Sequence, residues 1–237
     1  MPINEYNQRV ADPLPEWQPR ELPKKVTLKG KFCTIVPLDL EEHSQDLFDA
    51  YALVGDGRTW TYLRLGPFET LQEFRKGWED LPKEDTDIFF SIIDNNTNKP
   101  IGIFNLRKCD PANGVVEEGY VTFSPLLQRT KMATEANYLL AQYVFNTLKY
   151  RRFEWQCVDL NMPSHNAALR LGFKYEGTLR QNMVFKGRNR DTTWLSIIDK
   201  EWPVIQHAFE QWLDDSNFDS KGKQLQRLQD IRKCLCK

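Results

Sequence analysis

The 237-residue chain has no excess of charge of either sign, since 32 Lys and Arg nearly balance 33 Asp and Glu and leave a net charge of −1. Nucleic-acid-binding domains usually carry a basic patch and a high pI, and a sequence pI near 6.3 gives no such signature. No apolar run approaches the length of a membrane span, and the first residues lack a basic-then-apolar signal. We therefore expect neither a nucleic-acid partner nor a membrane association.

Residues that form disulfides or bind metals are few and scattered. The five cysteines and three histidines show no CxxC pair and no Cys/His spacing of a metal site. An odd number of dispersed cysteines is typical of a reduced, intracellular protein. We expect a cytoplasmic location, with the nucleus as the alternative, and no metal. Internal repeats and low-complexity segments are also lacking.

Three parts of the chain differ in composition. Residues 1–25 are polar and rich in proline, which predicts an extended arm. Residues 26–200 hold the patterns of a single main domain, and a 41% hydrophobic content is enough for one substantial core. Residues 201–237 carry two amphipathic helical patterns. We expect these helices to pack on the domain; binding to a partner is the alternative.

In the first half of the domain, local signals mark the elements. A strand is expected near 32–37, and Asp39 and Thr70 are predicted N-caps of two helices. Strands at 88–94 and 100–108 are joined by a run of turn formers, which predicts an antiparallel hairpin.

The segment 115–173 carries the most informative pattern. Residues 115–123 alternate in the manner of a strand, which Pro125 ends. Apolar residues then recur at helical spacing from Ala133 over roughly four turns. A further strand and a short helix that ends at Gly172 follow. The unit therefore reads as strand, polar loop, long helix, strand and short helix.

The loop 128–133 precedes the long helix. The first turn of a helix has free backbone N–H groups and the positive end of the helix dipole, which together suit a pyrophosphate. Arg129 and Lys131 add cationic side chains. A basic loop before a helix is also typical of a solvated connection, so the loop by itself leaves both interpretations open.

Three motifs occur in one order: ATEA at 133–136, NxxS at 161–164 and LGFxxEGxxR at 171–180. Together they resemble the GCN5-related N-acetyltransferase (GNAT) superfamily, and its RimJ/RimL type in particular, over about residues 32–198. The resemblance implies an α+β fold in α/β/α layers, with a mixed, mostly antiparallel sheet splayed between its fourth and fifth strands and flanked by helices. It implies an enzyme, a monomer or homodimer, that transfers an acetyl group from acetyl-CoA to an amine by direct attack on the thioester. The acceptor is either a small molecule or a protein N-terminus.

The resemblance also assigns residues to acetyl-CoA, with pyrophosphate on the loop and the pantetheine arm on the splayed strand and the short helix. The expected cofactor-binding residues are Val121, Thr122, Phe123, Gln128, Arg129, Thr130, Lys131, Met132, Ala133, Thr134, Asn161 and Ser164. The loop departs from the family pattern at Lys131, where a glycine is usual. Lysine accepts a left-handed backbone conformation only at a cost. The alternative, which we favour, is that its ammonium contacts phosphate.

Two residues are candidates for proton transfer. Strand alternation predicts that only one of Glu117 and Glu118 faces the cleft, and we favour Glu117 as the base because the resembled family places an acid there. The alternative is that both glutamates face solvent or pair with arginine on a neighbouring strand. Ser164 is the candidate beside the thiolate, because Ala168 occupies the position where many relatives carry tyrosine. Ser164 as the N-cap of the short helix is the competing interpretation.

The aromatic loop 55–68 borders the acceptor groove in the resembled family. Trp60 and Tyr62 are therefore expected to bind substrate; the alternative is that they pack the loop onto the core. A non-catalytic acyl-CoA-binding or interaction protein of the same fold is the rival function, motivated by Lys131, Ala168 and the extra terminal segments. The sequence does not identify the acceptor.

Overall fold

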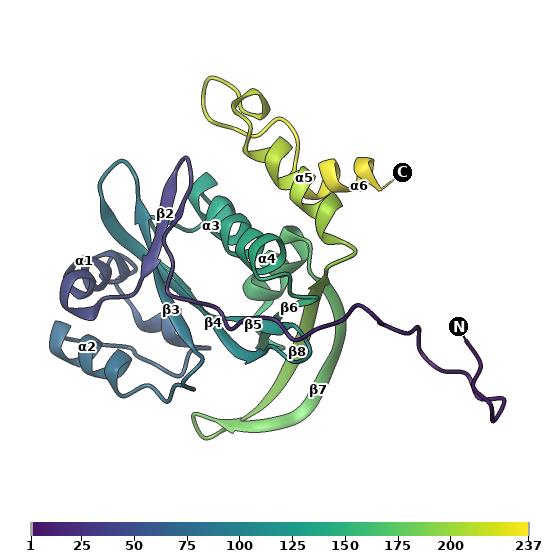
Figure 1. Cartoon of the computed structure of the whole chain (residues 1–237). Coiled ribbons are helices and arrows are strands. Elements are labelled where there is room, and N and C mark those ends of the chain that lie inside the picture. The colour runs from purple at the N-terminus through teal and green to yellow at the C-terminus, as the bar shows by residue number, and fades with distance from the viewer. Residues whose placement is uncertain (1, 237) are drawn as a thin grey trace.

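The computed structural model describes residues 2–236 as one mixed eight-stranded sheet with helices on both faces (Figure 1). The strands lie in the order β1-β2-β3-β4-β5-β6-β8-β7, and only β5 and β6 pair in parallel. The strands are β1 Leu28–Lys29, β2 Cys33–Pro37, β3 Ile88–Asp94, β4 Lys99–Asp110, β5 Val115–Phe123, β6 Arg152–Val158, β7 Lys174–Phe185 and β8 Arg188–Ile198. The helices are α1 Leu40–Ala52, η1 Gly57–Trp60, α2 Leu71–Glu79, α3 Lys131–Gln142, η2 Tyr143–Thr147, α4 Met162–Leu171, α5 Trp202–Leu213, η3 Asp215–Asn217 and α6 Leu228–Leu235.

Two buried apolar clusters cover opposite faces of the sheet. Helices α1 and α2 enclose the smaller cluster, which includes Tyr51 and Trp78, whereas α3, α4, α5 and α6 pack on the larger one. Along β4, Ile103 belongs to the smaller cluster and its neighbour Phe104 to the larger one. Successive side chains of a strand point to opposite faces, so both faces of β4 are buried. The predicted α/β/α layering is confirmed.

Side-chain caps begin the helices where the sequence predicts them. Asp39 accepts hydrogen bonds from two amides in the first turn of α1, and Thr70 forms a reciprocal capping box with Glu73 at the start of α2. Gly172 ends α4 with a φ of 120°, which favours glycine. Local chemistry therefore determines these boundaries.

Three features differ from the prediction. The four-turn helix pattern is divided between α3 and the π-helical segment η2. The two-residue strand β1 is too short to give a periodic signal and was not predicted. Leu225, which shares the apolar pattern of the last helix, is 64% exposed, because α6 begins only at Leu228.

Strands β5 and β6 separate part-way along their length. They pair from Val115↔Arg152 to Glu118↔Trp155, and β5 continues beyond this point with only β4 beside it. The register of β4 and β5 shifts between Ile103 and Asn105, and the residue of β5 at this shift, Tyr120, has a φ of 47°. A bulge of this kind bends and twists a strand. The splay was predicted between the fourth and fifth strands, which are β5 and β6 because the unpredicted β1 precedes them. It is therefore present.

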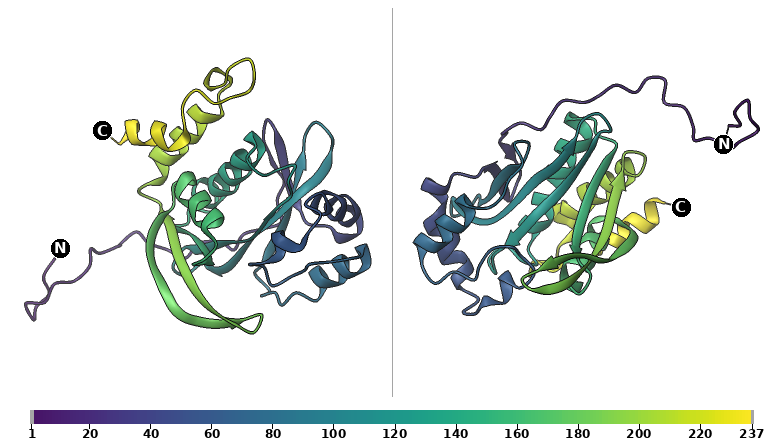
Figure 2. Two further views of the ribbon diagram at one scale, coloured as in Figure 1. Left: turned by 180° about the vertical axis from the view of Figure 1, so that it is seen from behind. Right: turned by 90° about the horizontal axis from the view of Figure 1, so that it is seen from below.

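The N-terminal arm runs along the body of the fold but extends away from it toward the N-terminus, whereas the C-terminal helices pack on the fold (Figure 2). In the N-terminal arm, the Trp17 indole donates a hydrogen bond to the Ala112 carbonyl over 2.9 Å. On the larger cluster, helix α6 buries Leu228 and Ile231, and Arg232 donates to two carbonyls at the end of α4. Within residues 2–236, no helix is long and apolar enough to cross a membrane.

Candidate active site

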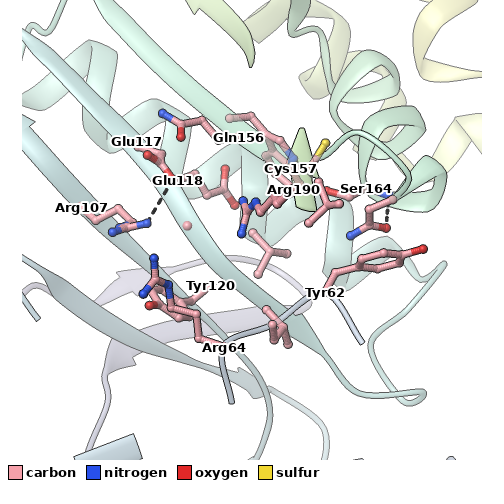
Figure 3. A pocket seen from close by; sticks show the side chains of 16 residues that line it. Tyr62, Arg64, Arg107, Glu117, Glu118, Tyr120, Gln156, Cys157, Ser164 and Arg190 are labelled. Carbon is pink, nitrogen blue, oxygen red and sulfur yellow. Dashed lines mark hydrogen bonds and ion pairs between the residues drawn. The ribbon is translucent and has the colours of Figure 1, made fainter. Parts of the chain in front are cut away.

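A pocket of about 110 Å³ lies where β5 and β6 separate (Figure 3). A water molecule occupies about 30 Å³ in the liquid, so the pocket accommodates a few small chemical groups rather than a whole nucleotide coenzyme. Its lining comes from both faces of the sheet: the loop after η1, strands β4, β5, β6 and β8, and the start of α4. The lining residues are Tyr62, Leu63, Arg64, Arg107, Glu117, Glu118, Gly119, Tyr120, Val121, Trp155, Gln156, Cys157, Val158, Asn161, Ser164 and Arg190.

Glu117 is a buried carboxylate with two cationic partners on β4. One carboxylate oxygen lies 2.8 Å from the Lys108 ammonium, and the other lies 3.5 Å from the Arg107 guanidinium. Burial raises the pKa of Glu117, while the charges of Lys108 and Arg107 oppose that rise. This is the ion-paired arrangement that the sequence left as an alternative.

Glu118 is buried without such compensation. Only 1% of the residue is exposed, and neither carboxylate oxygen has a hydrogen-bond partner among residues 2–236. Burial raises the pKa of Glu118 from its ordinary value of 4.5 to about 8. Glu118 is also the last residue of β5 that pairs with β6, so it lies at the vertex of the opening.

Both glutamates line the pocket, and the expectation that only one of them faces the cleft is wrong. Alternation assigns neighbouring residues to opposite faces of an intact sheet. Here the pocket passes between two separating strands, so that side chains from both faces border the same space (Figure 3).

Asn161 and Ser164 lie at the start of α4, and both line the pocket. Asn161 is the N-cap and accepts from the Ser164 amide over 3.3 Å, so the interpretation of Ser164 as the cap is wrong. The Ser164 hydroxyl oxygen accepts from the Trp155 indole over 3.0 Å. Because the indole N–H is a donor only, this bond leaves the hydroxyl proton of Ser164 free to donate. The Cys157 thiol is a neighbouring partner for it: burial raises the pKa of Cys157, and a hydrogen bond from Ser164 opposes that rise. Ala168, one turn later, is fully buried in the larger cluster.

Helix α3 begins with amides that have no protein acceptor. Thr130 is the N-cap, and its side chain accepts from the Ala133 amide. The amides of Arg129, Lys131 and Met132 have no hydrogen-bond acceptor within the described part of the chain. Arg129 has a φ of 62°, which turns the loop just before the helix. Successive free amides in such a turn form an anion-binding nest, so these residues fit a pyrophosphate.

Lys131 is the first residue of α3, and its backbone is helical. The conformational cost considered for lysine at this position therefore does not arise, because the left-handed residue is Arg129. The Lys131 ammonium lies 3.4 Å from the centre of the Phe218 ring, which follows η3. The backbone amide of Lys131 thus lies at the end of the loop, whereas its ammonium contacts Phe218 in the C-terminal segment.

Several predicted cofactor residues support the loop and the strand through their side chains. Gln128 donates to the Phe123 carbonyl over 2.7 Å and ties the loop to the end of β5. Thr122 donates from its hydroxyl to the Tyr120 carbonyl over 2.8 Å, and Thr134 accepts at its hydroxyl from Arg170. These side chains are thus engaged, and Val121 is the member of the set that lines the pocket from the end of β5.

The sequence pattern of the acetyltransferase (GNAT) domain matches residues 35–174. The chain belongs to the GNAT family of N-acetyltransferases. The uncharacterized N-acetyltransferase p20 of Bacillus licheniformis is 30% identical over 183 residues, which cover 74% of this chain and 98% of the relative. A crystal structure of a GCN5-related N-acetyltransferase from Brucella melitensis matches with 42% identity and a TM-score of 0.89, covering 93% of this chain and 100% of that one. A GNAT-family structure from Chromobacterium violaceum matches with 38% identity and a TM-score of 0.75, covering 83% and 98%.

Trp60 and Tyr62, the two aromatic residues predicted to bind substrate, lie in different surroundings. Tyr62 lines the pocket, and its hydroxyl donates to the Leu160 carbonyl over 3.3 Å. Trp60 is only 6% exposed and packs in the smaller cluster against Tyr51 and Phe68. The structure thus places Trp60 in the core, because the loop folds over the indole, rather than in a groove.

Sequence reasoning missed the arginines of the pocket. Arg64, Arg107 and Arg190 come from the loop after η1, from β4 and from β8, and no spacing in the sequence connects them. Only Arg107 had a usable signal, since it faces Glu117 across the turn between β4 and β5. Among the described residues, no group of three or more His, Cys, Asp or Glu side chains is placed to hold a metal ion.

Proposed function

We propose that this GNAT enzyme is of the RimJ/RimL type and transfers the acetyl group of acetyl-CoA directly to an amino group of a small molecule or a protein N-terminus. The observation that carries the proposal is the pocket at the vertex of β5 and β6. It brings together an unpaired buried carboxylate, Glu118, and a hydroxyl with an available proton, Ser164. A proton acceptor and a proton donor are what attack by an amine on a thioester requires.

The coenzyme would be held at two places. The free amides of Arg129, Lys131 and Met132 would bind the pyrophosphate, with the α3 dipole favouring its charge. The pantetheine arm would lie along the edge of β5 beyond Glu118, which has no strand beside it. The carbonyls of Tyr120, Thr122 and Phe123 already accept side-chain hydrogen bonds, so the arm would bind other backbone groups of this edge. Asn161 would add its side-chain amide. When bound, acetyl-CoA supplies the thioester that the amine attacks.

Glu118 is the proposed proton acceptor. The sequence favoured Glu117, but a carboxylate between Lys108 and Arg107 has its charge stabilised where it is. Glu118 has no such partner, and its raised pKa makes it the stronger base once it is deprotonated. In this assignment Glu117 positions the two cations. Ser164 would donate a hydrogen bond from its hydroxyl to the sulfur of the leaving thiolate and so stabilise it.

Calorimetric titration with acetyl-CoA, followed by thiol release across an amine panel, tests the proposal. Saturable binding with amine-dependent thiol release is the expected result. Absence of saturable binding at millimolar acetyl-CoA would overturn it. Binding without turnover of any physiological amine would instead support the rival function, a non-catalytic acyl-CoA-binding protein.

Asn161→Ala should weaken acetyl-CoA binding by about 1–3 kcal/mol, the cost of leaving a buried polar partner unsatisfied. Because Asn161 also caps α4, Asn161→Asp is the companion variant: it keeps the acceptor for the Ser164 amide, but replaces the side-chain N–H₂ donors with a carboxylate oxygen and adds a negative charge. We expect both variants to bind weakly in titration calorimetry. Normal affinity in Asn161→Asp would show that the residue is a cap alone.

Lys131→Met should change the dissociation constant of acetyl-CoA by less than about fivefold, as for an exposed charge pair worth under 1 kcal/mol. The reason is that the variant keeps the backbone amide at the loop, whereas the ammonium lies on the Phe218 ring. Titrations at low and high salt check this. If wild-type affinity falls with salt more steeply than that of the variant, the ammonium contacts phosphate, as the sequence favoured.

A further inference from the structure

The acceptor side of the pocket is rich in guanidinium groups. Arg64, Arg107 and Arg190 reach it from three elements that are distant in sequence, and their charged ends surround the same space (Figure 3). Arg107 pairs with Glu117, but neither Arg64 nor Arg190 has a carboxylate within 4 Å among residues 2–236. Two positive charges in the pocket are thus left without a counterion.

The carboxylates nearby neutralise these charges only in part: against the larger lowering by burial and by Arg64, the charge of Glu117 raises the pKa of Arg190. Glu117 is already shared by Arg107 and Lys108. Glu118, whose pKa is raised to about 8 by burial, is mostly protonated and neutral at pH 7. Burial, and secondly the neighbouring charge of Arg64, lower the pKa of the half-buried Arg190. Charges withdrawn from water are normally paired in proteins, so an anion that enters this space has a favourable site.

Packing fixes the orientation of Arg107 and Arg190. The guanidinium of Arg190 lies 5.2 Å from the centre of the Phe185 ring, and that of Arg107 lies 5.4 Å from the Tyr120 ring. Gly119 leaves room for Arg107, because a Cβ at this position would collide with its side chain. Stacked guanidinium groups lose little further freedom when they bind a planar or tetrahedral anion.

The β7–β8 hairpin bounds the pocket on the same side. The ammonium of Lys186 at its turn donates to the carbonyl of Trp60 over 2.9 Å and also contacts that of Gly66. This contact joins the hairpin to the loop that carries Tyr62 and Arg64. The space so enclosed suits a small molecule better than an extended polypeptide.

We propose that the acceptor is a small primary amine that also carries a carboxylate or phosphate group, which Arg64 and Arg190 bind while the amino group lies toward Glu118. This inference rests on the proposed acetyl transfer, and it specifies the substrate class of that site. Arg107 supports it by holding Glu117 and completing the positive wall of the pocket.

Matched amine pairs at saturating acetyl-CoA test the substrate class. Amino acids are compared with their amides, and O-phosphoethanolamine is compared with ethanolamine. We expect kcat/KM for the anionic member of at least one pair to be higher by about tenfold or more, the effect of one charge-assisted hydrogen bond. The pair with the larger ratio of kcat/KM shows whether the site prefers a carboxylate or a phosphate group. The amino group of an amino acid amide is less basic than that of the amino acid. A larger fraction of the amide is therefore unprotonated at neutral pH, which favours the neutral member of the pair and works against the expected result.

Arg64→Gln and Arg190→Gln test the residues. Each should raise KM for the anionic amine about tenfold or more, and should lower the ratio of kcat/KM for the anionic amine to kcat/KM for its neutral counterpart by a similar factor. Arg58→Gln is the control, since Arg58 lies near the same loop but pairs with Asp56 at the surface. Thermal melts of both variants show whether the loss of the Arg190 contacts with Phe185 and Thr192, or of the Arg64 contact with Met183, affects folding.

Two results would overturn the inference alone: neutral amines used as well as their anionic counterparts, or variants that impair both kinds of amine equally. Thiol release with no amine at all would overturn the proposed transfer and this inference together. The two failures are therefore distinguishable in the same assay.

Discussion

Glu118→Gln should lower kcat for acetyl transfer by roughly 10²–10⁴-fold, the usual contribution of a general base. Glutamine keeps the size of the buried side chain but cannot accept the amine proton. In the wild-type enzyme, kcat/KM should rise with pH through about 8 as Glu118 loses its proton. This rise should be absent in the variant, which keeps only the rise that comes from deprotonation of the amine substrate. Steady-state rates between pH 6 and pH 9.5 check both expectations.

Glu118→Gln should raise the free energy of unfolding, although it lowers kcat. Burial raises the folded-state pKa of Glu118 from 4.5 to about 8, so its stabilising contribution is complete below pH 4.5 and is lost as pH rises through 8. The free energy of unfolding of Glu118→Gln should therefore exceed that of the wild type increasingly between pH 5 and pH 9, by up to roughly 5 kcal/mol. Urea denaturation at several pH values measures this difference.

Glu117→Gln is the matched control for the base. It removes the negative charge shared by Lys108 and Arg107, and should lower the free energy of unfolding because two cations lose their partner. Its pH–rate profile should keep the wild-type rise. If Glu117→Gln abolishes that rise while Glu118→Gln retains activity, the base is Glu117, as the sequence favoured.

Glu135→Ala should destabilise the fold by roughly 3–5 kcal/mol, since leaving a buried donor unsatisfied costs about 1–3 kcal/mol per group. The Glu135 carboxylate on α3 accepts the amides of Lys31, Phe32 and Cys33 at 2.7, 2.7 and 2.8 Å. It thus fastens the turn before β2 to the first turns of the helix whose start is the proposed phosphate site. Urea denaturation provides the measurement.

The control for Glu135→Ala is Glu79→Ala, at the exposed end of α2, which should change stability little. A small effect in both variants would show that water replaces the Glu135 carboxylate at the turn. We also expect Glu135→Ala to weaken acetyl-CoA binding, because the start of α3 loses its attachment to β2.

Features that depend on neighbours in the sequence could be predicted from the sequence. Asp39 and Thr70 act on amides two or three residues away, and Gly172 supplies a conformation that its own lack of a side chain allows. The alternation of β5 and the helical spacing after Ala133 are likewise local periods. The three ordered motifs then indicated the GNAT family, which the matched residues 35–174 show.

The chemistry of the pocket depended on contacts between distant residues. Alternation could not decide between Glu117 and Glu118, because the partners of Glu117 lie on β4 and the pocket passes between strands that separate. The ammonium of Lys131 lies on Phe218, 87 residues further along the chain, as their numbers show.

The sequence by itself determined the family, the order of the elements and the helix that begins at the loop 128–133, since motifs, caps and periodicity act over a few residues. Only the tertiary structure decided which glutamate is unpaired, that Trp60 is core, and that Arg64 and Arg190 share one space. The physical reason is that desolvation and charge pairing depend on which groups the fold brings within a few ångströms, and the chain order does not record those distances.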